Sequence, residues 1–176
     1  MQPKGSILEL CQVVREMDRA LDHWPRVIGA GPFFVFDVPV LPGQFYRGQP
    51  TEVAMKVAFG FSGGLLIELL QQTNDGPSVF TEMLDGDAQG YHHVMLRVPY
   101  DDGVARLSGE GYDMAFRGRM PTGERFALFD TRSGNGGYVE LMELSPAMET
   151  SLERMHAAHC AWDGTTRPVR SMADLA

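Results

Sequence analysis

Hydrophobic and polar residues alternate over residues 7 to 14, which predicts a β-strand near the start of the chain. From Met17 the apolar residues recur every three or four positions, which predicts an amphipathic helix that reaches Ile28. Pro25 removes a backbone donor inside this helix, so we expect a kink or a new turn there. Residues 33 to 38 are almost entirely apolar and predict the next strand.

The rest of the first half completes a β-α-β-β-β unit. Residues 39 to 51 are rich in proline, glycine and glutamine and predict a loop over the surface. Two strands follow at about 53 to 60 and 65 to 71, and residues 61 to 64 join them as a hairpin-type turn. The first unit therefore covers about residues 7 to 71.

The same order of elements then repeats, after a linking helix predicted at residues 77 to 88. The second unit has a strand, a helix and three more strands, predicted at residues 91 to 98, 101 to 110, 112 to 119, 125 to 130 and 138 to 143. A C-terminal helix follows, which Ser145 caps and which is predicted at residues 146 to 162. We therefore predict a single α+β domain over residues 1 to 176, made of two modules at about 7 to 71 and 91 to 143.

Two near-copies of one short segment close the two units, Gly-Gly-Leu-Leu-Ile-Glu-Leu at residues 63 to 69 and Gly-Gly-Tyr-Val-Glu-Leu-Met at residues 136 to 142. Each places a glutamate, Glu68 or Glu140, among apolar residues. A carboxylate on a buried strand face is costly unless it is paired, protonated or bound to a metal. An exposed edge strand is the alternative interpretation, but the recurrence favours a shared metal site.

The bulk composition is that of a globular protein, with 44% hydrophobic and 22% charged residues. A formal net charge of -8 disfavours a nucleic-acid or anionic-membrane partner, since those contacts need clustered positive charge. We find neither the apolar stretch of a secretory signal nor a run of membrane-spanning length. Cys11 and Cys160 lie far apart in unrelated contexts. We therefore expect a cytoplasmic protein with free thiols.

With these features, the chain resembles the vicinal-oxygen-chelate superfamily, which includes glyoxalase I, methylmalonyl-CoA epimerase, type I extradiol dioxygenases and bleomycin-resistance proteins. The resemblance covers residues 7 to 143. It is carried by the doubled β-α-β-β-β order, by the His-His-Val strand opening at residues 92 to 94, and by the two Ile/Val-Glu-Leu strand ends. Each motif is short, but their order makes the resemblance specific.

The resemblance implies a half-open barrel from each module, with a divalent metal held in the cleft by the first and last strand of each. Carried over to this sequence, the ligand positions are Glu9, Glu68, His93 and Glu140. The first-strand position is usually His or Gln in the glyoxalase and epimerase branches, where this chain has Glu9. Three carboxylates and one imidazole suit Mn²⁺, Fe²⁺, Co²⁺, Ni²⁺ or Zn²⁺. Because side chains alternate along a strand, we expect His92 to point to the opposite face from His93.

The function that the resemblance implies is that of a divalent-metal-dependent lyase or isomerase of the glyoxalase or epimerase type. It would act on a small carbonyl-containing substrate through a metal-stabilised enediolate, and Glu140 or Glu9 would move the proton. An alternative is a metal-free small-molecule binding or resistance protein that uses the same cleft, with its acids attracting a cationic ligand. An extradiol dioxygenase fits less well, because it needs two histidines and one carboxylate on iron. A homodimer is also expected from the resemblance, because open barrels leave sheet edges.

Two further sets of residues have simple interpretations. Glu52 and Lys56 could reach the cleft and act on substrate, although a solvated edge is the simpler interpretation of both. Several methionines are interpreted as core fillers, namely Met55, Met95, Met114 and Met142.

Overall fold

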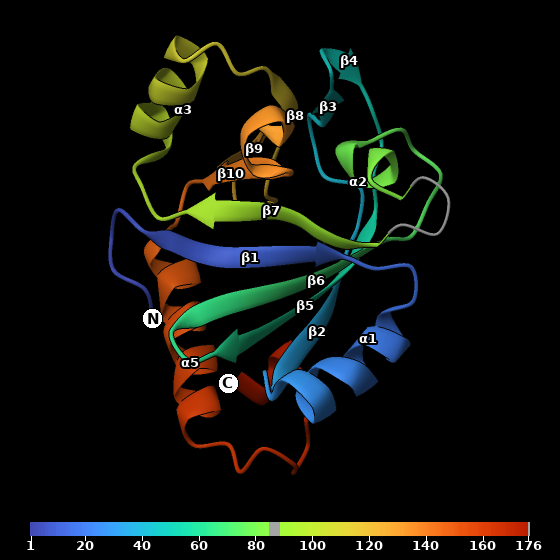
Figure 1. Ribbon diagram of the computed structural model, residues 1–176, viewed down its shortest axis with the longest axis vertical. Coiled ribbons are helices and arrows are strands. Elements are labelled where there is room, and N and C mark those ends of the chain that lie inside the picture. Colours follow the sequence, from blue (N-terminus) through green and yellow to red (C-terminus); the bar gives the residue numbers. More distant parts are fainter. Residues whose placement is uncertain (85–88, 176) are drawn as a thin grey trace.

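A computed structural model describes residues 1–84 and 89–175 of the chain (Figure 1). The first module follows the predicted order, and the helix does change at Pro25, where a short π-helix, η1, continues α1. Its elements are β1 (Ile7–Val13), α1 (Met17–His23), η1 (Trp24–Ile28), β2 (Phe33–Val38), β3 (Phe45–Tyr46), β4 (Gln49–Pro50), β5 (Met55–Ser62) and β6 (Leu65–Gln72).

The second module repeats the order and is followed by a C-terminal segment. The elements are α2 (Val79–Glu82), β7 (Gly90–Leu96), α3 (Tyr100–Gly109), β8 (Met114–Arg119), β9 (Arg125–Asp130), α4 (Arg132–Asn135), β10 (Tyr138–Met142), α5 (Pro146–Cys160), β11 (Val169–Ser171) and η2 (Met172–Leu175). The linking helix predicted at 77 to 88 is only the single turn α2, and residues 85–88 of that prediction lie outside the described residues. The predicted C-terminal helix is present but ends at Cys160.

The segment predicted as a surface loop at 39 to 51 contains a small hairpin instead. Its strand β3 pairs with β8 of the second module, so that Phe45 lies opposite Arg117 and Tyr46 opposite Phe116. The proline and glycine content of the segment conceals this pairing, because the partner strand lies about 70 residues away in sequence and local composition carries no sign of it. The hairpin therefore joins the first module to the second.

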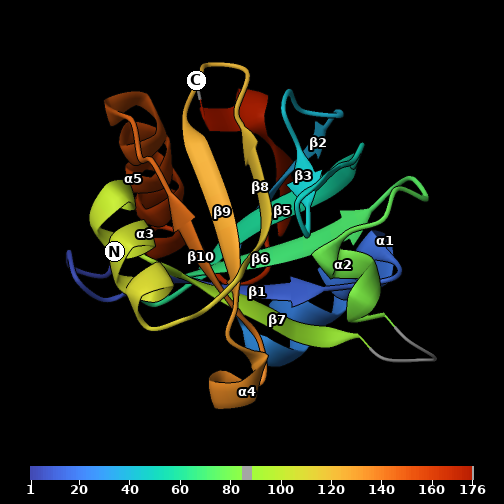
Figure 2. The same ribbon diagram turned by 90° about the horizontal axis from the view of Figure 1, so that it is seen from above.

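Within the described residues, eleven strands form one mixed sheet in the order β11-β2-β5-β6-β1-β7-β10-β9-β8-β3-β4. The modules meet at the centre, where β1 and β7 lie side by side and antiparallel (Figure 1). On the outer sides of this pair, β6 runs parallel to β1 and β10 parallel to β7. The sheet curves without closing on itself (Figure 2), so the predicted half-open α+β architecture is confirmed.

Helices cover both sides of this sheet. Met17 and Leu21 of α1 pack with the buried side chains of the first module, and Leu107 of α3 packs with those of the second. The longest helix, α5, packs through Leu152 and Met155 against side chains of β5, β6 and β7. No helix in the described part of the chain is long and apolar enough to cross a membrane.

Candidate metal centre

Four adjacent strands at the middle of the sheet each supply one side chain that can bind a metal. The strand register arranges these side chains in two rows. Glu68 and His93 both lie opposite Cys11 of β1, and Glu9 and Glu140 both lie opposite Met95 of β7. The four residues are Glu9 on β1, Glu68 on β6, His93 on β7 and Glu140 on β10.

The four predicted ligands converge on one point. One side-chain atom from each lies within 4.8 Å of those of the other three. The Nε2 atom of His93 lies 2.9 Å from Oε2 of Glu140, and it lies 3.4 Å from both Oε1 of Glu9 and Oε2 of Glu68. All four are buried, with relative exposures between 1% and 7%. Residues separated by as many as 131 positions in sequence are thus brought together by the central strands.

Burial and crowding shift the protonation of this group. Burial raises the pKa of Glu9 well above its ordinary value, and the neighbouring carboxylate of Glu68 raises it further. Burial also raises the pKa of Glu140, although His93 opposes this shift. For His93 burial alone would lower the pKa, but the surrounding Cys11, Glu140 and Glu68 side chains outweigh burial and raise it. In the protein without a cation, the site therefore holds protons that a metal would displace.

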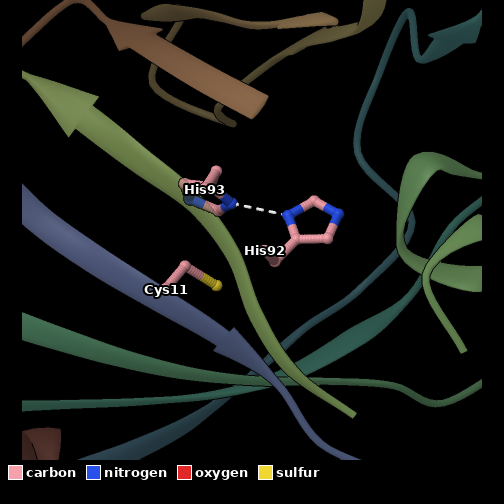
Figure 3. A group of neighbouring side chains, drawn as sticks. All are labelled: Cys11, His92 and His93. Carbon is pink, nitrogen blue, oxygen red and sulfur yellow. Dashed lines mark hydrogen bonds between the residues drawn. The ribbon is translucent and has the colours of Figure 1, made fainter. Parts of the chain in front are cut away.

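His92 does not point away from His93 as predicted. In the pairing of β7 with β1, Cys11 lies opposite His93 and Gln12 opposite Tyr91, so His92 is the extra residue of a β-bulge. The bulge breaks the strict alternation of side chains. The Nδ1 atoms of His92 and His93 consequently lie 2.8 Å apart in a hydrogen bond (Figure 3).

This hydrogen bond fixes which nitrogen of His93 faces the carboxylates. Nε2 of His92 lies 3.2 Å from the carbonyl oxygen of Val79, which can only accept, so Nε2 carries a hydrogen. Burial and the nearby His93 lower the pKa of His92, which is therefore neutral. Its Nδ1 must then accept a hydrogen bond from Nδ1 of His93. Nε2 of His93 is left to act as a ligand, an arrangement typical of metal-binding histidines.

The donor set fits a divalent cation. Among the described residues, Oε1 of Glu9 and Nε2 of His93 are buried side-chain atoms that form no well-aligned hydrogen bond, although they lie 3.4 Å apart, and both face the centre of the site. Buried polar atoms without partners are unfavourable, and coordination to a cation would satisfy both. Three carboxylate oxygens and one imidazole nitrogen suit first-row divalent ions from Mn²⁺ to Zn²⁺.

Cys11 forms a second group with His92 and His93 that shares His93 with the first (Figure 3). Burial raises the pKa of the Cys11 thiol well above its ordinary value, and the charge of Glu68 raises it further. A neutral thiol is a poor ligand, because metals bind the thiolate. We therefore assign Cys11 a packing role beside the carboxylate site.

A cavity of about 340 Å³ opens above the four residues. Three of the methionines interpreted as core fillers, Met55, Met95 and Met142, do pack in the hydrophobic core, and they also line this cavity. Met95 follows His93 by two positions and Met142 follows Glu140 by two, so the period of the strands places them on the site's face. That signal was present in the sequence. Neither Glu52 nor Lys56 lines the cavity. Glu52 is exposed, whereas Lys56 is partly buried on β5, which lies between β2 and β6 and is not an edge strand.

Comparison with known proteins supports the fold. No family model matches the chain, and no curated protein matches it by sequence. A hypothetical protein, BH1468, from Bacillus halodurans C-125 superposes with a TM-score of 0.57 at 18% identity, over 80% of this chain and 94% of its own. Methylmalonyl-CoA epimerase from Mycobacterium tuberculosis gives a TM-score of 0.55 at 16% identity, over 85% and 95%.

A Streptomyces coelicolor methylmalonyl-CoA epimerase variant in complex with 2-nitronate-propionyl-CoA superposes with a TM-score of 0.52 at 18% identity, over 80% of this chain and 97% of its own. The chain has the vicinal-oxygen-chelate fold. At these identities the likeness concerns the fold alone, so the chemistry of the site must be argued from its own residues.

Proposed function

We propose that this protein is a divalent-metal-dependent isomerase or lyase that acts on a small carbonyl-containing substrate. The supporting observation is the convergence of Glu9, Glu68, His93 and Glu140 within 4.8 Å at one end of an apolar cavity. A bound divalent cation would stabilise negative charge on a carbonyl oxygen and so acidify the neighbouring C–H bond.

The residues of the chain divide the remaining tasks. Glu68 and His93 hold the cation, and His92 orients the imidazole through the hydrogen bond between their Nδ1 atoms. Glu140 or Glu9 takes the proton from carbon and returns it, because burial raises the pKa of each and makes each a stronger base. The mostly apolar cavity wall lowers the polarity around the site, which strengthens the electrostatic interactions inside it.

Metal binding and proton transfer can be tested separately. Titration calorimetry with Mn²⁺, Co²⁺, Ni²⁺ and Zn²⁺ should show one ion per chain, and Glu68→Gln and His93→Ala should each weaken binding at least about tenfold. Proton exchange between a vicinal diketone and D₂O, followed by NMR, should fall about 100-fold in Glu140→Gln or Glu9→Gln.

Glu52→Gln is the matched control, because Glu52 is exposed and does not line the cavity. The control should bind metal and exchange protons as the unaltered protein does. If the purified protein binds none of the four ions and Glu68→Gln changes nothing, the proposal is wrong.

One observation supports a metal-free binding protein as a second candidate. Nε2 of His93 lies 2.9 Å from Oε2 of Glu140, so a protonated imidazole could offset part of the carboxylate charge without a metal. Such a protein would bind its ligand equally well after treatment with a chelator. Elemental analysis of the purified protein, followed by ligand titration with and without EDTA, separates the two candidates.

A further inference from the structure

Apolar side chains form most of the lining of the cavity above the site. At the base, the buried side chains of Leu66, Phe80 and Met95 surround the site residues. Near solvent the lining includes partly exposed side chains such as Phe36 and Met120. A volume of about 340 Å³ lies at the small end of ligand-binding pockets. The cavity thus has room for a compact ligand, and its mostly apolar lining favours a ligand with apolar surface.

The charged side chains of the lining are all acidic, apart from His93. Apart from His93, the charged side chains that line the cavity are the three site carboxylates and Glu124. Within residues 1–84 and 89–175, no lysine or arginine lines it. A carboxylate or phosphate on the ligand, away from the four site residues, would lose its hydration without gaining a cationic partner. The wall therefore selects against anionic ligands.

The C-terminal segment supplies one wall of the cavity. Its contribution is mainly apolar, through Met148, Leu152, Met155 and Met172, with Ser145 and Ser151 as its polar members. The wall is fastened to the rest of the molecule at both ends of α5. Arg97 forms an ion pair of 2.9 Å with Glu149, and the backbone N–H of Gly63 donates to Nε2 of His159 at 3.2 Å. The segment is thus a fixed part of the binding site.

We infer that the ligand is an uncharged carbonyl compound with an apolar alkyl or aryl tail, its oxygens at the four site residues and its tail against α5 and η2. The placement of the carbonyl end rests on the proposed function, whereas recognition of the tail depends only on the wall. Methionine side chains adapt to different shapes, so the wall selects by charge and apolar area. Methylmalonyl-CoA carries a carboxylate and phosphates, and we expect it to bind poorly here.

The test compares three probes by titration calorimetry on the full chain, both loaded with Zn²⁺ and treated with EDTA. The probes are a methyl pentyl vicinal diketone, the same diketone with a carboxylate at the end of its tail, and butanedione, which has no tail. We expect the neutral tailed diketone to bind at least about tenfold more tightly than either of the others. Equal affinity for the neutral and carboxylated diketones would overturn the inference.

A charge placed on the wall tests the same idea from the side of the protein. Met148→Arg puts a guanidinium into the lining at a partly exposed position, and we expect it to reverse the preference in favour of the carboxylated diketone. Ala157→Arg adds the same charge at an exposed position of α5 outside the lining and should keep the original preference. Circular dichroism would confirm that both variants fold, and a folded Met148→Arg without reversal would contradict the inference.

The two proposals fail in different ways. If the preference for the neutral tailed diketone persists in EDTA while no deuterium exchange occurs with any ion, the ligand class stands and the metal-dependent reaction is wrong. If exchange occurs but all three probes react and bind equally, the reaction stands and the ligand class is wrong.

Discussion

His92 contacts both Tyr138 and the site residue His93. Its ring stacks on Tyr138 at a centroid distance of 4.8 Å and accepts the hydrogen bond that orients His93. His92→Phe would keep the stacking but remove the acceptor, so we expect metal affinity to fall about 10- to 100-fold. Calorimetry would measure the loss, and ¹⁵N NMR of the imidazoles should show His93 as a mixture of tautomers.

His23→Phe is the control for this substitution, because His23 is exposed on α1 and far from the site in the fold. Unchanged metal affinity and an unchanged tautomer in His92→Phe would show that the hydrogen bond between the two histidines has no role in orienting His93.

The two cysteines should differ sharply in reactivity. Cys11 is buried and its pKa is raised by burial, whereas Cys160 is exposed on α5. Since the thiolate is the reactive form, we expect an aromatic disulfide reagent to modify one thiol per folded chain and two after denaturation. Cys160→Ser should abolish the reaction of the folded protein, and rapid modification of Cys11 in this variant would contradict the expected burial.

At the residue scale, the repeated segments and the family resemblance together predicted the four converging side chains. The repeat in the sequence pointed to Glu68 and Glu140, and the resemblance to the vicinal-oxygen-chelate superfamily added Glu9 and His93. The contact of His92 with His93 was not predictable from alternation, because a bulge depends on the register between two strands.

Among the secondary-structure elements, α2 is small but holds several segments together through one carboxylate. Glu82 accepts hydrogen bonds from Nε of Arg47 at 2.7 Å and from the hydroxyl of Tyr138 at 2.9 Å, and also one from the hydroxyl of Tyr46. Arg132 of α4 approaches it to 3.0 Å. This single turn therefore connects the β3–β4 hairpin to the end of the second module.

Replacement of this carboxylate should make the stability of the protein less dependent on pH. Burial would raise the pKa of Glu82, but hydrogen bonds from Arg47, Tyr46 and Tyr138 outweigh it and lower the pKa from 4.5 to about 2. The charged form is thus favoured by folding, and its contribution is present above pH 4.5 and lost as the pH falls toward 2. We expect Glu82→Gln to lower the free energy of unfolding by roughly 2 kcal/mol at neutral pH.

Urea denaturation from neutral pH down to about pH 3 would measure this effect. The difference between Glu82→Gln and the unaltered protein should shrink across that range. Glu153→Gln, at an exposed position of α5, should show no such difference. A constant difference at all pH values would mean that packing, and not the charge of Glu82, is responsible.

The elements themselves were predictable to the extent that their pattern is local. The period of apolar residues was sufficient for the two module orders and for α5. The pairings of β3 with β8 and of β11 with β2 could not be predicted, because each involves only two or three residues and a partner that is distant in sequence. Neither strand has a pattern long enough to distinguish it from a loop.

For the whole molecule, the repeat in the sequence implied two similar modules, but it could not reveal how they share a cavity. That depends on the antiparallel pairing of β1 with β7, which brings the last strands of both modules to either side. It depends also on α5 and η2, which lie outside the repeat and complete the wall. The site is consequently a property of the assembled sheet and its C-terminal segment.

A cation in this site should stabilise the whole molecule, and more so at higher pH. Burial raises the pKa of Glu9 and Glu140, and the surrounding side chains raise that of His93. With their folded pKa values above the unfolded ones, these three side chains contribute most to the stability of the metal-free protein at low pH, and their contribution is lost as the pH rises through the folded values. A bound cation offsets the repulsion between the charged carboxylates of Glu9, Glu68 and Glu140. At low pH, protons compete with the cation for these side chains.

The gain in melting temperature on adding Zn²⁺ or Mn²⁺ should therefore be larger at about pH 8 than at about pH 5.5. Scanning calorimetry with the ion or with EDTA at both pH values measures it. Glu68→Gln removes one of the four carboxylate or imidazole donors and should reduce the gain at both pH values. The same gain at both pH values would show that the four buried side chains do not form a cation site.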